Sequence, residues 1–241
     1  MIHLVALGDS FTCGEGVGVH VPLAATWTAL LAGAIPGAHH TSYATPGARV
    51  RDVRQYQVPK VSSATIVTLL VGLNDVARSG WDAGRVEGDL VSVADELCHR
   101  ADTVLLVRLH DPVRLLWVPA PLRRLARERV AVVNAAVDRA SRLPRVHVLD
   151  LARVELLRDR AVWAVDGVHP DPAGHVALAQ AASAVLRDAG HLVGATPPVP
   201  QCRAASRRER AHWLARHGLP YLARNVRTLG TPALEGVLRR A

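Results

Sequence analysis

The 241-residue sequence predicts an α/β fold in which helices cover both faces of a central parallel sheet of about five strands. Short apolar runs rich in β-branched residues alternate with longer stretches of helical spacing, which is typical of βαβ units. These runs lack a polar face, as expected for strands buried on both sides. The predicted strands span residues 2–7, 65–71, 103–109 and 145–149, with a candidate fifth near 38–44, and the predicted helices span 22–33, 49–57, 86–100, 120–141 and 172–189.

The last predicted helix has a well-defined beginning. Asp171 can accept hydrogen bonds from the free amides of the first turn, and Pro172 suits the first helical position. The residues that come just before Asp171 are therefore held at the entrance of a helix.

Composition divides the chain into three parts. Residues 1–193 are long enough and apolar enough for one well-filled domain. Residues 194–202 begin with a glycine and contain three prolines, which predicts a linker. Residues 203–241 hold nine arginines against two glutamates, so this extension carries +7 of the formal net charge of +8.

The basic extension is expected to be helical, with Trp213 and Leu214 on the apolar side of a helix over residues 204–217. Three interpretations stay open for it: it packs on the domain, it binds an anionic membrane surface or acidic partner, or it contacts nucleic acid. No zinc-finger, RRM or convincing helix-turn-helix motif accompanies it, so a nucleic-acid partner is not expected.

Cysteine content and hydropathy indicate a cytoplasmic protein. Cys13, Cys98 and Cys202 are few, odd in number and widely spaced, which fits neither a disulfide framework nor a metal site. No apolar run approaches the roughly 18 residues that span a bilayer, and the motif at residues 8–10 comes too early for a preceding signal peptide. Cys13 lies near that motif but has no accompanying Cys-His pattern, so we expect a small core residue there.

A first candidate nucleophile follows the first strand directly. Gly8-Asp9-Ser10 places Ser10 at the carboxyl end of that strand, where open α/β sheets hold their ligands. The tripeptide by itself is equally compatible with a strand-to-helix turn in which Asp9 or Ser10 caps a helix.

A candidate base and its acceptor lie just before the last helix, in Asp166-Gly-Val-His169-Pro. A serine hydroxyl needs a base within hydrogen-bond reach, and that base needs an acceptor that fixes its tautomer. His169 and Asp166 can fill these two positions. An ordinary turn followed by a helix cap accounts for an isolated Asp-x-x-His equally well.

Other polar residues also follow predicted strands. Asn74, in Gly-Leu-Asn-Asp after the third strand, and Gly47, in Ala-Thr-Pro-Gly-Ala-Arg, can donate hydrogen bonds to a developing oxyanion. Helix capping and a plain turn are the alternatives. Residues 110–129 are a candidate lid over the substrate or an ordinary loop and amphipathic helix. The candidate substrate-lining residues are Asp9, Asp75, Trp81, His110 and Trp163.

Taken together and in order, the four blocks resemble those of the SGNH hydrolase family, also called GDSL esterases. The family's Ser, Gly, Asn and His are matched by Ser10, Gly47, Asn74 and His169. Two departures concern supporting loops: residues 11–18 contain additional glycines, and Ser42-Tyr43 replaces an asparagine that many members carry before the glycine block.

The resemblance implies a flavodoxin-like αβα sandwich and acyl transfer to Ser10 followed by hydrolysis. It implies that His169 deprotonates Ser10, that Asp166 orients His169, and that the amides of Ser10, Gly47 and Asn74 form the oxyanion hole. It requires no metal and no organic cofactor.

Three functional hypotheses follow. The first is an esterase that acts on a small acylated molecule, with deacetylation of a sugar or secondary metabolite as one form. The second is an acyltransferase or thioesterase that uses the same triad, because the acyl-enzyme step is shared. The third is a membrane- or partner-binding module with a vestigial site, against which the four intact blocks argue.

Overall fold

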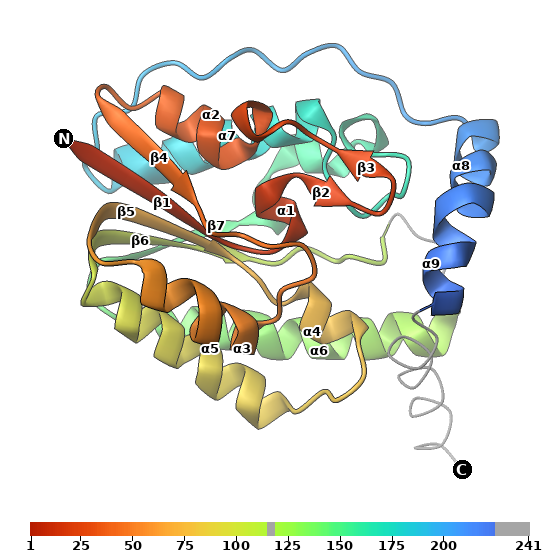
Figure 1. Cartoon of the computed structure of the whole chain (residues 1–241), viewed down its shortest axis with the longest axis horizontal. Helices are drawn as coiled ribbons and strands as arrows, with labels where there is room; N and C mark the ends of the chain where they lie inside the picture. The colour runs from red at the N-terminus through yellow and green to blue at the C-terminus, as the bar shows by residue number, and fades with distance from the viewer. Residues whose placement is uncertain (115–118, 225–241) are drawn as a thin grey trace.

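Figure 1 shows the computed structural model of the chain, which describes residues 1–114 and 119–224. Its main sheet has the order β4-β1-β5-β6-β7, and all neighbouring strands are parallel. This is the flavodoxin-like order, so the predicted α/β class and sheet are confirmed. The strands are β1 (Ile2–Gly8), β4 (Ala38–Ser42), β5 (Ala64–Leu70), β6 (Ala101–Arg108) and β7 (Val146–Asp150).

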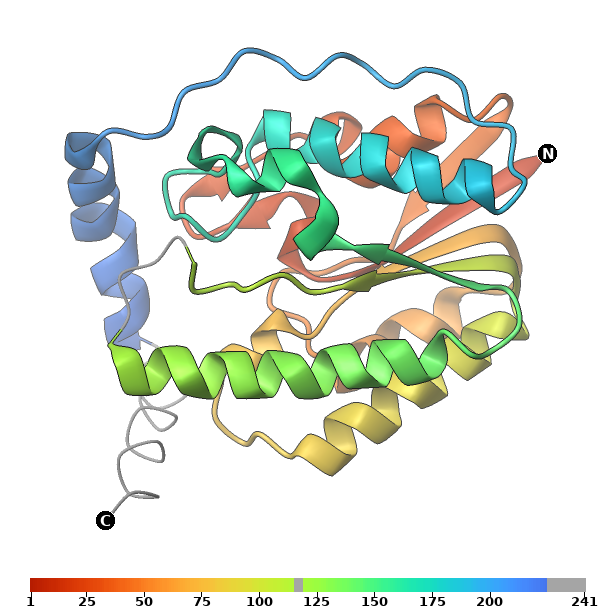
Figure 2. The ribbon, with the colours of Figure 1, turned by 180° about the vertical axis from the view of Figure 1, so that it is seen from behind.

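Helices cover both faces of the sheet (Figures 1 and 2). One face carries α2 (Trp27–Gly33) and α7 (Pro172–Asp188). The opposite face carries α3 (Val50–Asp52), α4 (Leu73–Ala77), α5 (Ala83–Cys98) and α6 (Ala120–Ala140). The start of α7 is as predicted, since the Asp171 side chain accepts a hydrogen bond from the Gly174 amide.

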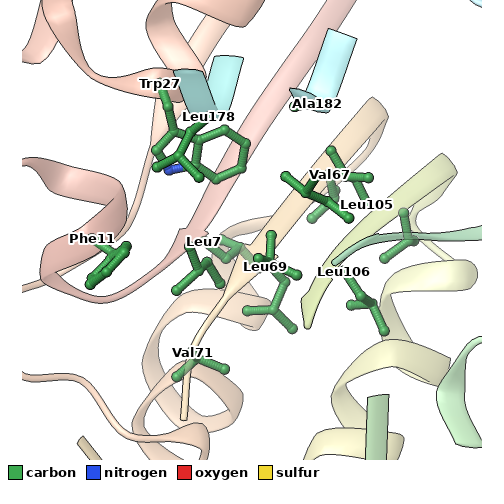
Figure 3. Close-up of a cluster of buried hydrophobic side chains, with 14 of the residues drawn as sticks. Leu7, Phe11, Trp27, Val67, Leu69, Val71, Leu105, Leu106, Leu178 and Ala182 are labelled. Carbon is green, nitrogen blue, oxygen red and sulfur yellow. The ribbon is translucent and has the colours of Figure 1, made fainter. Parts of the chain in front are cut away.

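Apolar side chains of the strands meet those of the helices in one continuous core. Figure 3 shows Leu7 of β1 and Leu69 of β5 near Trp27 of α2 and Leu178 of α7. The side chain of Trp27 is fully buried, and its backbone amide donates a hydrogen bond to His175 Nδ1 at 3.1 Å. Burial lowers the pKa of His175 to about 4, so the ring stays neutral and can accept this bond. Packing and this hydrogen bond join α2 to α7.

Two predicted helices are shorter or less regular than expected. The segment 22–33 is a 3₁₀ turn (Leu23–Ala25) followed by α2, because buried Thr26 is extended between them and its hydroxyl donates to the Leu23 carbonyl. The segment 49–57 begins as α3 and continues as a π-helical turn, Val53–Gln57.

Several short elements were not predicted, since each is too short for a periodic pattern. They include α1 (Ser10–Cys13), α4, a hairpin of β2 (Glu15–Gly16) with β3 (Val19–His20), and the 3₁₀ turns Leu151–Arg153, Glu155–Arg158 and Arg160–Val162.

After α7 the chain runs without helix or strand through the predicted linker, residues 194–202. It then forms α8 (Arg207–Trp213), a π-helical turn (Leu214–Gly218) and α9 (Leu219–Arg224), here called the C-terminal helical segment. Figures 1 and 2 show this segment beside the β2–β3 hairpin, at the edge of the molecule. No helix within residues 1–114 and 119–224 is long and apolar enough to cross a membrane.

Candidate active site

Ser10, His169 and Asp166 form a continuous hydrogen-bonded row. The Ser10 hydroxyl lies 2.9 Å from His169 Nε2, and His169 Nδ1 lies 2.6 Å from Asp166 Oδ2. The carboxylate requires a hydrogen on Nδ1, which leaves the Nε2 lone pair directed at the hydroxyl. The arrangement can therefore take the proton of Ser10 when the hydroxyl attacks an electrophile.

The carboxylate of Asp166 is fixed by its own loop. Its second oxygen accepts hydrogen bonds from the amides of Val168 at 2.9 Å and His169 at 3.0 Å. Asp166 is only 8% exposed, so these bonds replace water around the charge. The sequence alone leaves two interpretations of Asp166 open, a tight turn or an acceptor for His169. In the structure, the same carboxylate makes both sets of hydrogen bonds.

The Asp9 side chain makes hydrogen bonds to residues close to Ser10. Within the described residues, it makes none to His169 or Asp166. One of its oxygens accepts from the Phe11 amide at 3.0 Å, which caps α1, and the other accepts from Asn74 Nδ2 at 3.2 Å. The side chain is fully buried, and burial raises the pKa of Asp9 to about 7. Asp9 therefore links the beginning of α1 to the beginning of α4.

Asn74 is held between two acceptors. Its Nδ2 donates to Asp9 and to the Ala48 carbonyl, both at 3.2 Å. Both distances lie at the long end of the ordinary range for N–H···O hydrogen bonds, about 2.7–3.2 Å. Asn74 and Gly47 line the same cavity as Ser10 and His169.

The cavity beside Ser10 has a volume of about 580 Å³, within the range of about 300–1,000 Å³ of small-molecule sites. Part of its lining comes from the α/β fold and part from the C-terminal helical segment. The apolar lining residues are Phe11, Val17, Leu73, Ala77 and Val168, joined by Trp213, Leu214, Gly218 and Tyr221 of the C-terminal helical segment.

Gly16 lets the hairpin approach the catalytic-site histidine. A Cβ atom at this position would lie 2.5 Å from His169 Nδ1, which is too close for any side chain. The additional glycines of residues 11–18, which depart from the simplest form of the first block, therefore shape the loop that lies against His169.

His110 and Trp163 do not line this cavity, in contrast to the prediction. Their rings lie 4.9 Å apart, and Phe11 lies between Trp163 and His169 with 6.0 Å to each ring centroid. The Trp163 indole donates to the Leu157 carbonyl, and burial lowers the pKa of His110 to about 4. His110 and Trp163 thus pack against Phe11, and Phe11 in turn packs against the His169 ring.

Asp75 and Trp81 also lie away from the cavity lining. The buried Asp75 carboxyl accepts a hydrogen bond from the Val50 amide, which holds the start of α3, and burial raises the pKa of Asp75 to about 6. Trp81 is half-buried beneath the Arg129 guanidinium, 5.2 Å from its ring centroid. Asp75 lies in α4 and Trp81 in the loop that follows it, and both side chains contact other neighbours.

Residues 110–129 are the candidate lid of the sequence analysis. Residues 115–118 of this segment lie outside the described residues, and none of its other residues lines the cavity. The segment that does line it is the C-terminal helical segment. The apolar pair Trp213-Leu214 in a basic helix was the signal in the sequence, but nothing in it indicated where the helix packs.

Cys13 is half-buried, and burial raises the pKa of its thiol, which disfavours the nucleophilic thiolate. It does not line the cavity. Within the described part of the chain, no group of three or more His, Cys, Asp or Glu side chains is placed to hold a metal ion.

Comparison with known families identifies the fold and its motifs. The family model described as GDSL-like Lipase/Acylhydrolase family matches residues 6–177, which include Ser10, Gly47, Asn74, Asp166 and His169. A search of curated protein sequences finds no significant match.

Solved structures share the architecture at low sequence identity. A lipolytic protein of the G-D-S-L family from Veillonella parvula is 22% identical, with a TM-score of 0.60 over 78% of this chain and 99% of that one. A variant of an acetyl xylan esterase from Geobacillus stearothermophilus is 22% identical, with a TM-score of 0.59 over 81% and 97%. Phospholipase A1 from Streptomyces albidoflavus is 18% identical, with a TM-score of 0.59 over 76% and 98%. At these identities the likeness establishes the fold.

Proposed function

Since the chain belongs to the GDSL-like lipase/acylhydrolase family and is a carboxylic ester hydrolase, we propose that it acts through a covalent acyl-enzyme on Ser10. The observation that carries the proposal is the hydrogen-bonded row from Ser10 through His169 to Asp166 at a cavity of substrate size. The substrate proposed is a small acylated molecule, and no cofactor is needed for the chemistry.

In the acylation step, Ser10 Oγ attacks the ester carbonyl carbon while His169 Nε2 takes the hydroxyl proton. Asp166 stabilises the resulting imidazolium, and the carbonyl oxygen becomes an oxyanion. The amides of Ser10 and Gly47 and the side chain of Asn74 stabilise that oxyanion. When the tetrahedral intermediate collapses, the bond to the alcohol oxygen breaks and His169 returns the proton to the alcohol.

In the deacylation step, a water molecule takes the place of the alcohol. His169 removes a proton from this water, the hydroxide attacks the acyl carbon, and the bond to Ser10 Oγ breaks. Ser10 regains its proton from His169, and the carboxylic acid leaves. An acyltransferase or thioesterase would share the acyl-enzyme and differ only in the acceptor or the leaving group.

The test is hydrolysis of p-nitrophenyl esters from acetate to laurate by the wild type, with Ser10→Ala and His169→Ala in parallel. We expect turnover by the wild type and a loss of orders of magnitude in both variants, with unchanged circular dichroism spectra. A wild type inert toward every ester, or an equally active Ser10→Ala, would overturn the proposal. Acyl transfer to an added alcohol or turnover of thioesters only would favour the second hypothesis.

A further inference from the structure

We propose that the C-terminal helical segment determines substrate specificity: it completes an apolar pocket that selects esters with acyl chains longer than acetyl. The proposal rests on the ester hydrolysis at Ser10 proposed above, and it assigns the acyl-chain class for that site. It also gives a role to the part of the chain that lies beyond the family match, which ends at residue 177.

The segment closes the side of the cavity that the α/β fold leaves open. Trp213, Leu214 and Tyr221 line the cavity together with Ser10 and His169. Figures 1 and 2 show α8 beside the β2–β3 hairpin and α9 continuing toward the beginning of α6, far in sequence from the strands whose ends carry the polar residues. The reacting atoms and the apolar wall thus come from different parts of the chain.

The β2–β3 hairpin anchors this wall. The Trp213 indole Nε1 donates a hydrogen bond of 2.7 Å to the carbonyl of Val17 in the hairpin turn. The next residue, Gly18, has φ +67°, and a Cβ atom there would lie 2.7 Å from the His217 ring. A residue with a side chain at position 18 would be strained and would displace the helix, so this turn is shaped to receive it.

The same hairpin places the wall close to the reacting atoms. Gly16 lies against the His169 ring on one side, while Val17 holds Trp213 on the other. An acyl group attached to Ser10 therefore lies within reach of the Trp213 and Leu214 side chains, which face the cavity.

The chemistry of the lining fits an apolar chain. Leu73 and Ala77 of α4 contribute apolar surface in addition to Trp213 and Leu214, and an acetyl group alone would leave most of a 580 Å³ cavity unfilled. Each methylene that is removed from water against such surfaces raises kcat/KM about fourfold. The charged side chains of Glu15 and Arg78 line the same cavity and can face the polar alcohol part of the ester.

The test compares kcat/KM for p-nitrophenyl acetate and octanoate in the full-length protein. The variants are Trp213→Ala, which removes the largest side chain of the wall, and Leu214→Ala, which removes a smaller one. Arg208→Ala is the matched control, because this exposed side chain lies on the same helix outside the cavity lining. Thermal unfolding is recorded for each protein.

We expect the wild type to prefer octanoate. Trp213→Ala should lower the octanoate-to-acetate ratio of kcat/KM about tenfold or more. Leu214→Ala should lower the ratio by a smaller factor, and Arg208→Ala should leave it unchanged. Leu214→Ala keeps the Trp213 anchor, so it tests the wall even if Trp213→Ala fails to fold.

An active wild type that prefers acetate, or a ratio that neither Trp213→Ala nor Leu214→Ala changes, overturns this inference and leaves the hydrolase function intact. A wild type inert toward all esters overturns the proposed function itself. The two failures are therefore distinguished by wild-type activity alone.

Discussion

The catalytic cavity has two walls with contrasting physical character. On the α/β side, Asp9 is fully buried and Asp166 is 8% exposed, and both carboxyl groups are held by backbone amides. On the C-terminal side, the lining residue Leu214 is 43% exposed. The proposed chemistry thus depends on groups that the core holds in place, while the proposed selection of substrate depends on a lightly attached surface helix. Substitutions in the two walls should consequently have separable effects.

The largest expected difference is in turnover. Ser10→Ala should lower kcat by about 10⁴–10⁶-fold, because it removes the atom that forms the covalent bond. Substitutions in the C-terminal wall should not approach this loss with a short ester. Steady-state kinetics with p-nitrophenyl acetate measures both. A Ser10→Ala variant that keeps a tenth of the activity would contradict the assignment of the nucleophile.

A smaller loss is expected from the oxyanion donors. Asn74→Ala should lower kcat by about 10²–10³-fold with little change in KM, because the amide stabilises charge that develops after binding. Asp82→Ala is the control, since this residue caps α5 through the Arg85 amide and does not line the cavity. The control should lose about 1 kcal/mol of stability and keep its kcat. Equal kcat values for the two variants would remove Asn74 from the oxyanion site.

Substitutions in the α/β fold and in the C-terminal helical segment should also differ in their effect on stability. Leu105→Ala, at a fully buried position of β6, should lower the free energy of unfolding by about 2–5 kcal/mol, because it removes packed methylenes and leaves a cavity. Leu214→Ala should change it by less than about 0.5 kcal/mol, because the side chain is already partly in water. Urea denaturation of both variants measures the difference. A comparable loss in Leu214→Ala would show that the C-terminal helical segment is part of the cooperative core.

The smallest expected effect concerns the pH dependence of stability. Because the pKa of Asp9 is raised to about 7, its contribution is fully present below about pH 4 and is lost as the pH rises through 7. Asp9→Asn removes this titration. Its free energy of unfolding relative to wild type should therefore rise by about 2 kcal/mol between pH 5 and pH 7.

His169 and Asp75 are the charged groups that interact with Asp9, so Asp9→Asn removes this coupling together with the titration of the carboxyl group. Urea denaturation at the two pH values gives the difference. Parallel profiles for wild type and Asp9→Asn would mean that the carboxyl group titrates in its ordinary range.

The α/β class, the five strands and the cap of α7 could be predicted from sequence because they depend on local patterns. Buried parallel strands require nearly continuous apolar runs, and Asp171-Pro172 satisfies the first turn of a helix by itself. The candidate positions of Ser10, Asn74 and His169 followed from one further rule, that the carboxyl ends of parallel strands share an edge.

The directions of side chains beyond those strand ends could not be predicted. His110 follows the end of β6 more closely than Asn74 follows the end of β5, yet it packs behind His169 against Trp163. Asp75 is adjacent to Asn74, yet it accepts from Val50. Neighbouring residues on a helix or turn point in different directions, so proximity in sequence to a site residue does not place a side chain in the site.

The strands, the cap of α7 and the residues at the sheet edge follow from short-range patterning and chain chirality, which leave few alternatives. Three contacts depend instead on how distant parts of the chain pack: Asp9 supports Asn74, Gly16 lies against His169, and Trp213 lines the same cavity as Ser10. The hydrogen bond from Trp213 to Val17, which holds this wall, joins positions 196 residues apart across a proline-containing linker. Long-range contacts of this kind depend on complementary surfaces, and those surfaces form only when the hairpin has folded. Here the surface consists of the Val17 carbonyl and the space left by Gly18, which has no side chain.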